Sequence, residues 1–215
     1  EISAQRSEID KLKRDEKSLS NLVEQLAKII TKPAKKKTHK SKKTSSVKNT
    51  VSSKQENQST TSNATNTAVL TNEETPTDTF NDQNFASLKG KLRLPVRGEL
   101  VNRFGSNRVD TGLSWKGLFI RAPEGSEVKS VANGLVVFAD WMRGFGNLII
   151  VDHGSGFMSL YGNNQSVLKQ VGETVSAGEH IAAVGNTGGN ESNGLYYELR
   201  RQSKPFDPLS WSIIR

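Results

Sequence analysis

From Leu92 to the C-terminus, short apolar or alternating runs are separated by turns that contain glycine. Several short strands with turn chemistry between them indicate a compact, mainly β domain, and about 120 residues are ample for one hydrophobic core. The predicted strands are Leu92–Val96, Phe119–Ala122, Glu127–Ala132, Leu135–Ala139, Leu148–Asp152, Met158–Tyr161, His180–Val184 and Leu195–Arg200.

Residues 1–31 follow a heptad pattern instead. One position holds Ile2, Ile9, Val23 and Ile30, with Glu16 as the exception, and the other holds Leu12, Leu19 and Leu26, with Gln5 out of pattern. This pattern predicts a coiled-coil helix that ends before Pro33. Because the pattern is already running at residue 1, we expect the C-terminal part of a longer coil. A single amphipathic helix packed on the β domain is the alternative.

The segment between these parts is rich in Lys, Ser, Thr and Asn and has few large apolar side chains. Such a segment cannot offset its ordering entropy by burial, so we predict a flexible linker over residues 32–84 and a globular domain over 85–215. Its lysines favour a solvated spacer, with a nucleic-acid-binding tail as the weaker alternative. Phe80, Phe85 and Leu88 predict a short helix that packs on the domain.

Charge and composition exclude several classes of function. Basic residues outnumber acidic ones by 17 to 11 in residues 1–91 but only by 13 to 11 in residues 92–215, so the β domain is no basic nucleic-acid-binding module. The absence of cysteine excludes disulfides, thiolate zinc sites and thiol catalysis, and suits an oxidising extracytoplasmic compartment. No apolar stretch approaches the roughly 18–20 residues that cross a bilayer.

The order of motifs carries a family resemblance. The segments LSWKGLFI, VGETVSAGEHIAAVGNTGG and GLYYELRR follow one another as in the LytM (lysostaphin-type) zinc endopeptidase domain, which the chain resembles over roughly residues 92–211. The run ADW-x-x-GFG, the phrase MSLYG-x-NQS and the ending LYYELRR resemble EnvC-type amidase activators of the Gram-negative division machinery, as does a coiled coil before the domain. A duplicated-hybrid-motif β fold is therefore expected.

The resemblance also implies that the catalytic centre of this family is degenerate here. Active relatives hold zinc with a His and an Asp four residues apart and with a third ligand from a His-x-His motif; the corresponding residues are Trp115, Phe119 and Tyr196. The two assisting histidines correspond to Asn163 and Gly194. Indole, phenyl and neutral phenol groups are not zinc ligands, and Asn163 exchanges no proton near neutral pH. We therefore expect no metal, no cofactor and no catalytic residue.

Strand alternation predicts which side chains line the old cleft. Leu195, Tyr197 and Leu199 should face the core, so Tyr196 and Arg200 should lie on the groove side. By the resemblance, the residues that contact a partner are Lys116, Phe145, Leu148, Tyr196 and Arg200. Alternation would place Lys116 opposite Trp115 unless Gly117 bends the strand. His39, His153 and His180 are expected to be structural or exposed to solvent.

The function implied by the resemblance is non-enzymatic. EnvC-type domains activate periplasmic N-acetylmuramoyl-L-alanine amidases in septal peptidoglycan splitting and daughter-cell separation, and the coiled coil would engage the FtsE/FtsX membrane complex at the division septum. An additional helix that occludes the groove until that complex signals would be a two-state switch, and residues 80–88 are a candidate for it. Peptidoglycan is a further partner that we weigh, and nucleic acid is not expected. A peptidoglycan-binding scaffold and an active zinc endopeptidase are the alternative functions.

Overall fold

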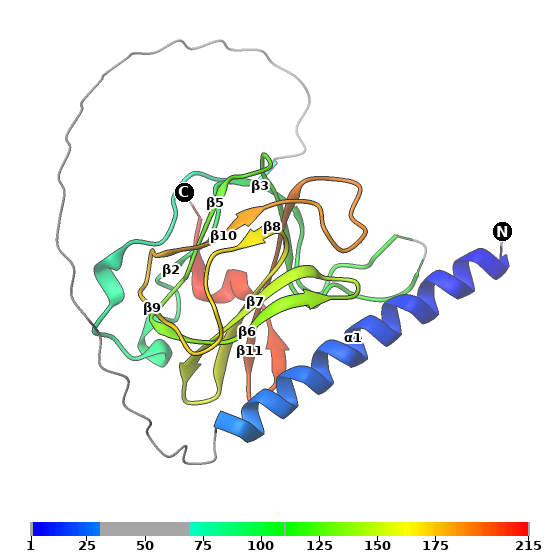
Figure 1. Ribbon diagram of the computed structural model, residues 1–215. Coiled ribbons are helices and arrows are strands. Elements are labelled where there is room, and N and C mark those ends of the chain that lie inside the picture. Colours follow the sequence, from blue (N-terminus) through cyan, green and yellow to red (C-terminus); the bar gives the residue numbers. More distant parts are fainter. Residues whose placement is uncertain (1, 31–68, 110, 215) are drawn as a thin grey trace, which may run out of the picture.

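The computed structural model describes residues 2–30, 69–109 and 111–214 (Figure 1). The linker prediction for residues 31–68, including His39, lies outside these residues. The described part is one helix, α1 (Ile2–Ile30), and a mainly β domain, which confirms the predicted fold class. The strands are β1 (Thr71–Asn72), β2 (Leu92–Arg93), β3 (Gly98–Asn102), β4 (Leu118–Arg121), β5 (Glu127–Lys129), β6 (Gly134–Met142), β7 (Gly146–Gly154), β8 (Phe157–Val167), β9 (Thr174–Val175), β10 (His180–Val184), β11 (Gly194–Arg201), β12 (Lys204–Phe206) and β13 (Ser212–Ile213).

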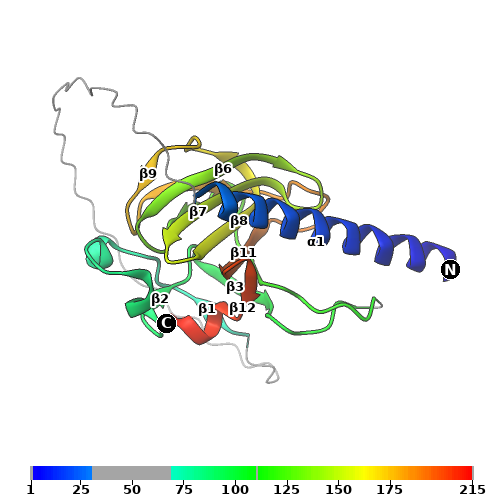
Figure 2. The ribbon, with the colours of Figure 1, turned by 90° about the horizontal axis from the view of Figure 1, so that it is seen from below.

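Eleven strands form one sheet in the order β1-β3-β4-β11-β8-β7-β6-β9, in which β10 pairs with β5 and β8, and β12 pairs with β11. All of these pairs are antiparallel, whereas β13 and β2 form a small parallel pair. The central strands β7, β8 and β11 are nearly continuous runs of buried residues because both of their faces are covered. The main core packs on one face, and α1 lies across the other (Figure 2).

The boundary predicted for the linker at residue 84 is wrong over the stretch 69–84, which packs on the domain. Strand β1 pairs with β3. Asn72 is 1% exposed and donates from Nδ2 to the carbonyl oxygens of Glu74 and Val96 at 2.8 and 2.9 Å. Polar residues with few large apolar neighbours can be ordered in this way, by backbone pairing and by one buried amide, which composition does not reveal.

The short helix predicted around Phe80–Leu88 is present as two 3₁₀ turns, Asp78–Phe80 and Phe85–Leu88. Phe85 and Leu88 are buried in the main core, and the Phe85 ring stacks on the His153 ring with centroids 4.6 Å apart. This segment therefore closes the core on the side away from α1, and its candidacy as the helix that occludes the groove is wrong.

His153 is structural, as expected, and its environment predicts a pH effect. The ring donates from Nδ1 to the Asn133 carbonyl oxygen at 2.7 Å, and its Nε2 lies 2.6 Å from Ser159 Oγ. Burial lowers the pKa of His153 from 6.5 to about 4, so the folded state resists a proton that the unfolded chain accepts. This contribution to stability is complete above pH 6.5 and is lost as the pH falls towards 4.

We expect His153→Gln to remove this dependence. The two pKa values correspond to at most about 3 kcal/mol of unfolding free energy. The difference in unfolding free energy between wild type and variant should therefore shrink by an amount of that order between pH 6.5 and pH 4. Urea denaturation at a series of pH values measures it, and a difference that does not vary with pH would contradict the assignment.

Within the described residues, no helix is both long enough and apolar enough to span a bilayer.

Candidate functional site

The side chains of β11 alternate between the two faces of the sheet, as predicted. Leu195, Tyr197 and Leu199 belong to the main core, whereas Tyr196 belongs to a second apolar cluster on the opposite side. Strand β11 pairs antiparallel with β4 and β8, and Tyr196 lies opposite Phe119 on β4 and Gly162 on β8. The second side is therefore a surface that the centre of the sheet builds and holds rigidly.

The three positions that correspond to zinc ligands come together on this side. Phe119 and Tyr196 are cross-strand partners, and the Trp115 and Tyr196 ring centroids lie 6.3 Å apart. The Phe119 ring lies directly over Gly194, where an added Cβ would come 2.5 Å from Phe119 Cζ. The fifth position, Asn163, is buried at a positive φ of 65°, and its Nδ2 donates to the Thr187 carbonyl oxygen at 2.9 Å.

This donor set does not fit zinc. Across residues 2–30, 69–109 and 111–214, no group of three His, Cys, Asp or Glu side chains gathers closely enough to hold a metal. Tyr196 is the one oxygen donor among the three aligned residues, and burial raises its pKa well above the usual value for a phenol, so it stays neutral. The three side chains form an aromatic surface instead, which is the composition of a protein-binding site.

Arg108 completes this aromatic surface, although no local sequence pattern predicts it. Its guanidinium lies over the Trp115 ring, 4.0 Å from the centroid. A cation over an indole face is attracted by the quadrupole of the ring. Arg108 lies in the loop that leads to Trp115, seven residues before it, so only the folded loop shows the contact.

Helix α1 covers the groove. Leu19 and Val23 are 1% and 0% exposed, and they pack in one cluster with Phe145, Leu148 and Tyr196. Leu22, Leu26 and Ala27 are half-buried against the same cluster. Figure 2 shows the second half of α1 lying across β7, β8 and β11 while its first half projects past the domain.

Two polar contacts fix the position of the helix over the groove. Asp15 is 5% exposed and accepts a hydrogen bond from Arg143 Nε at 2.8 Å. The neighbouring Gly144 has φ +83°, and a Cβ there would come 2.5 Å from Asp15 Oδ2, so the turn between β6 and β7 needs glycine both for its conformation and for the close approach. Further along, Arg200 Nη1 donates to Ser20 Oγ at 3.3 Å.

Arg200 is mainly engaged within the domain. Its Nε and Nη2 donate to Glu198 Oε1 at 3.1 and 2.8 Å, and its Nη1 donates to the Ser203 carbonyl oxygen at 3.1 Å. Arg200 is 2% exposed and Glu198 is fully buried. Burial raises the pKa of Glu198 to about 7, Arg200 opposes the shift, and Glu16 on α1 adds to it. Because the folded state holds this proton more tightly than the unfolded chain, the contribution of Glu198 to stability falls as the pH rises from about 4.5 to 7.

The predicted partner-contact residues do not all lie together. Phe145, Leu148 and Tyr196 line the floor beneath α1, and Arg200 reaches Ser20 at its edge. Lys116 is half-buried with its Nζ 3.4 Å from Ser114 Oγ. Strand β4 begins at Leu118, so alternation does not govern residues 115–117, and the apparent conflict between Trp115 and Lys116 disappears. The role of these five residues in binding stays a prediction.

The helix predicted over residues 1–31 is present, and its second half packs on the domain as the alternative interpretation has it. Residues 3–14 are exposed or half-buried. The heptad exception Glu16 lies at the groove, beside the buried Asp15. The break in the heptad pattern thus marks the point along α1 at which the helix begins to pack on the domain. Pairing of α1 with another helix stays a prediction.

The fold is that of a LytM-like domain. Residues 113–208 match the model of peptidase family M23. A zinc-containing peptidase of Vibrio cholerae superposes with a TM-score of 0.51 at 24% identity, over 54% of this chain and 38% of that one. This likeness shows the fold alone.

Two curated relatives are more similar in sequence. The murein hydrolase activator EnvC of Escherichia coli (strain K12) is 47% identical over 123 residues, which are 57% of this chain and 29% of that protein. The cell division protein DipM of Caulobacter vibrioides is 35% identical over 142 residues, 63% of this chain and 23% of the relative. The predicted resemblance is confirmed for the domain, while the chain spans less than a third of the length of either relative.

Proposed function

We propose that this chain is a non-enzymatic activator of periplasmic N-acetylmuramoyl-L-alanine amidases in septal peptidoglycan splitting and daughter-cell separation. One observation carries the proposal: the degenerate cleft binds an amphipathic helix. The helix is the chain's own α1, which buries Leu19 and Val23 on the groove floor. A surface that accepts α1 in this way has the form of a helix-binding groove, and a helix of the amidase is the partner that we assign to it.

In this proposal α1 keeps the chain inactive until it leaves the groove. The amidase helix and α1 compete for the same apolar floor, so the fraction of open molecules sets the stimulation. The names of the two relatives, a murein hydrolase activator and a cell division protein, support the assignment of the pathway.

The exposed first half of α1 suits a role outside the groove. Residues 3–8 are exposed, and Ile9 and Leu12 are half-buried. We assign this half, continued towards the N-terminus, to the FtsE/FtsX membrane complex at the division septum. Engagement of the coil there would pull α1 from the groove, and the location is the periplasm of a Gram-negative cell.

The test mixes the chain with its cognate amidase and dye-labelled peptidoglycan. We expect the chain to increase dye release by the amidase, to release nothing alone, and to hold no stoichiometric zinc by elemental analysis after zinc soaking and desalting. Cosedimentation with purified sacculi without any stimulation would favour the peptidoglycan-binding scaffold instead. Zinc-dependent cleavage of wall crosslinks by the chain alone would show an endopeptidase and contradict the proposal.

A further inference from the structure

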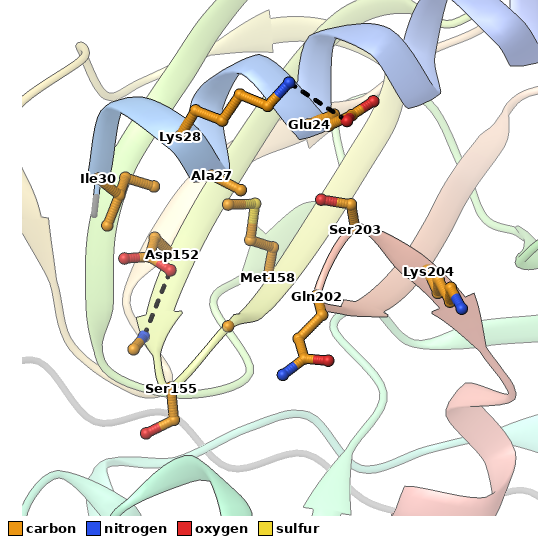
Figure 3. Close-up of a pocket in the computed structure, with 12 residues that line it drawn as sticks. Glu24, Ala27, Lys28, Ile30, Asp152, Ser155, Met158, Gln202, Ser203 and Lys204 are labelled. Carbon is orange, nitrogen blue, oxygen red and sulfur yellow. Dashed lines mark hydrogen bonds and ion pairs between the residues drawn. The ribbon is translucent and has the colours of Figure 1, made fainter. Parts of the chain in front are cut away.

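Among the residues that the structure describes, the C-terminal end of α1 leaves part of the groove unfilled. A cavity of about 800 Å³ lies between the last turns of α1, the turn that joins β7 to β8, and the turn that joins β11 to β12 (Figure 3). The helix contributes Glu24, Ala27, Lys28 and Ile30 to its wall, and the domain contributes Asp152, residues 154–156, Met158 and residues 202–204.

This cavity continues the apolar groove. Met158 is 3% exposed and belongs both to the groove cluster with Leu19 and Val23 and to the cavity wall. Ala27 also belongs to both, and Figure 3 shows it against Met158. The methionine is unbranched and adapts its shape to what packs on it.

Three apolar residues of α1 face the groove in one row, and the side chain of the third, Ala27, does not fill the space beside it. Asp15, Leu19, Val23 and Ala27 follow one another at intervals of four residues, which places neighbours of this row on one face. Asp15 meets Arg143, and the two aliphatic side chains are almost fully buried. At the fourth position a single methyl group stands beside the cavity.

We propose that this cavity is the binding site for a large apolar side chain, such as Leu, Met or Phe, that the amidase helix carries at the position of Ala27. The proposal rests on the function proposed above. The fitting partner is a helix with an acidic residue, then two aliphatic residues and then the large apolar residue, each four positions apart. Filling the cavity gives such a helix an advantage over α1, and so allows it to take the groove.

The test needs no amidase. The probe is a fluorescent peptide of residues 10–30, either unchanged or with Ala27→Leu, and the receptor is the full chain with Leu19→Asp and Val23→Asp, which opens the groove. A peptide with Gln25→Leu adds the same side chain at an exposed position and is the matched control. Leucine adds three carbon atoms to alanine, and the partial burial of their apolar surface should give about tenfold tighter binding for the Ala27→Leu peptide.

The outcomes separate this inference from the proposed function. Tighter binding by the Ala27→Leu peptide, with the Gln25→Leu peptide no tighter than the unchanged one, supports the cavity as a side-chain site. Equal affinity of all three peptides overturns it, even if the open chain stimulates the amidase strongly. In the full chain, Ala27→Leu should hold α1 more firmly and lower amidase stimulation about tenfold, and an unchanged or increased stimulation would count against the site.

Discussion

Replacing both Leu19 and Val23 by aspartate should raise amidase stimulation by at least about tenfold. These two side chains of α1 are 1% and 0% exposed, and each loses its apolar contact with the groove floor when it becomes a carboxylate. Removing a buried aliphatic side chain costs about 2–5 kcal/mol, and burying an unpaired carboxylate costs more, whereas 1.4 kcal/mol already shifts an equilibrium tenfold. The helix should leave the groove while the domain, with its separate main core, stays folded.

The measurement is dye release from labelled peptidoglycan at a fixed amidase concentration and a series of chain concentrations. Ser18→Asp with Asn21→Asp is the control, because it adds the same two charges to exposed positions of α1. Equal stimulation by wild type, control and the groove-facing variant would show that α1 does not restrain the activator.

Replacing Arg200 by alanine should destabilise the domain by about 3–5 kcal/mol. The change leaves the fully buried Glu198 without the guanidinium that donates two hydrogen bonds to its Oε1. A buried ion pair broken on one side costs far more than its net contribution, because Glu198 must then either stay charged without a partner or take up a proton at a pH where the unfolded chain is ionised. Urea denaturation near pH 8, above the Glu198 pKa of about 7, measures the full effect.

The double variant Glu198→Gln with Arg200→Met provides the comparison. Replacing both partners by uncharged residues should recover a large part of the lost stability, since no charge stays buried. If Arg200→Ala unfolds at the same urea concentration as wild type, the pair carries no structural role. Any loss of amidase stimulation by an Arg200 variant is therefore interpretable only when its fold is checked in parallel.

Much of the domain could be predicted from sequence because its pattern is local. Alternation along Leu195–Arg200 separates core from groove, and glycine-bounded apolar runs locate the central strands. The heptad of α1 predicted a helix but not its partner, because Leu19 and Val23 suit another helix as well as a groove floor. Arg143 and Arg108 meet their partners only through the fold, and the Asp15–Arg143 pair joins residues 128 positions apart.

The candidate site, too, could be predicted only in part from the sequence. Motif order placed Trp115, Phe119 and Tyr196 together, and the structure brings them together. The sequence could not show that residues 80–88 pack in the main core, since Phe85 and Leu88 are as apolar as residues that would cover the groove. Nor could it show the cavity beside Ala27, because an alanine in a helix is compatible with tight packing and with an empty space alike.

A reversible crosslink between α1 and the groove tests the central claim most directly. The chain has no cysteine, so Asp15→Cys with Gly144→Cys creates a single possible disulfide. A Cβ at Gly144 would lie 2.9 Å from Asp15 Cβ, against about 3.8 Å in a disulfide, so the helix must move outward slightly to form the bond. Because Gly144 has φ +83°, a cysteine there also strains the turn, and the oxidised and reduced forms of the same double variant are therefore compared. We predict that the oxidised chain fails to stimulate the amidase and that reduction restores stimulation above the wild-type level. Equal stimulation before and after reduction, with the crosslink shown to be complete, would contradict the groove beneath α1 as the amidase-binding surface.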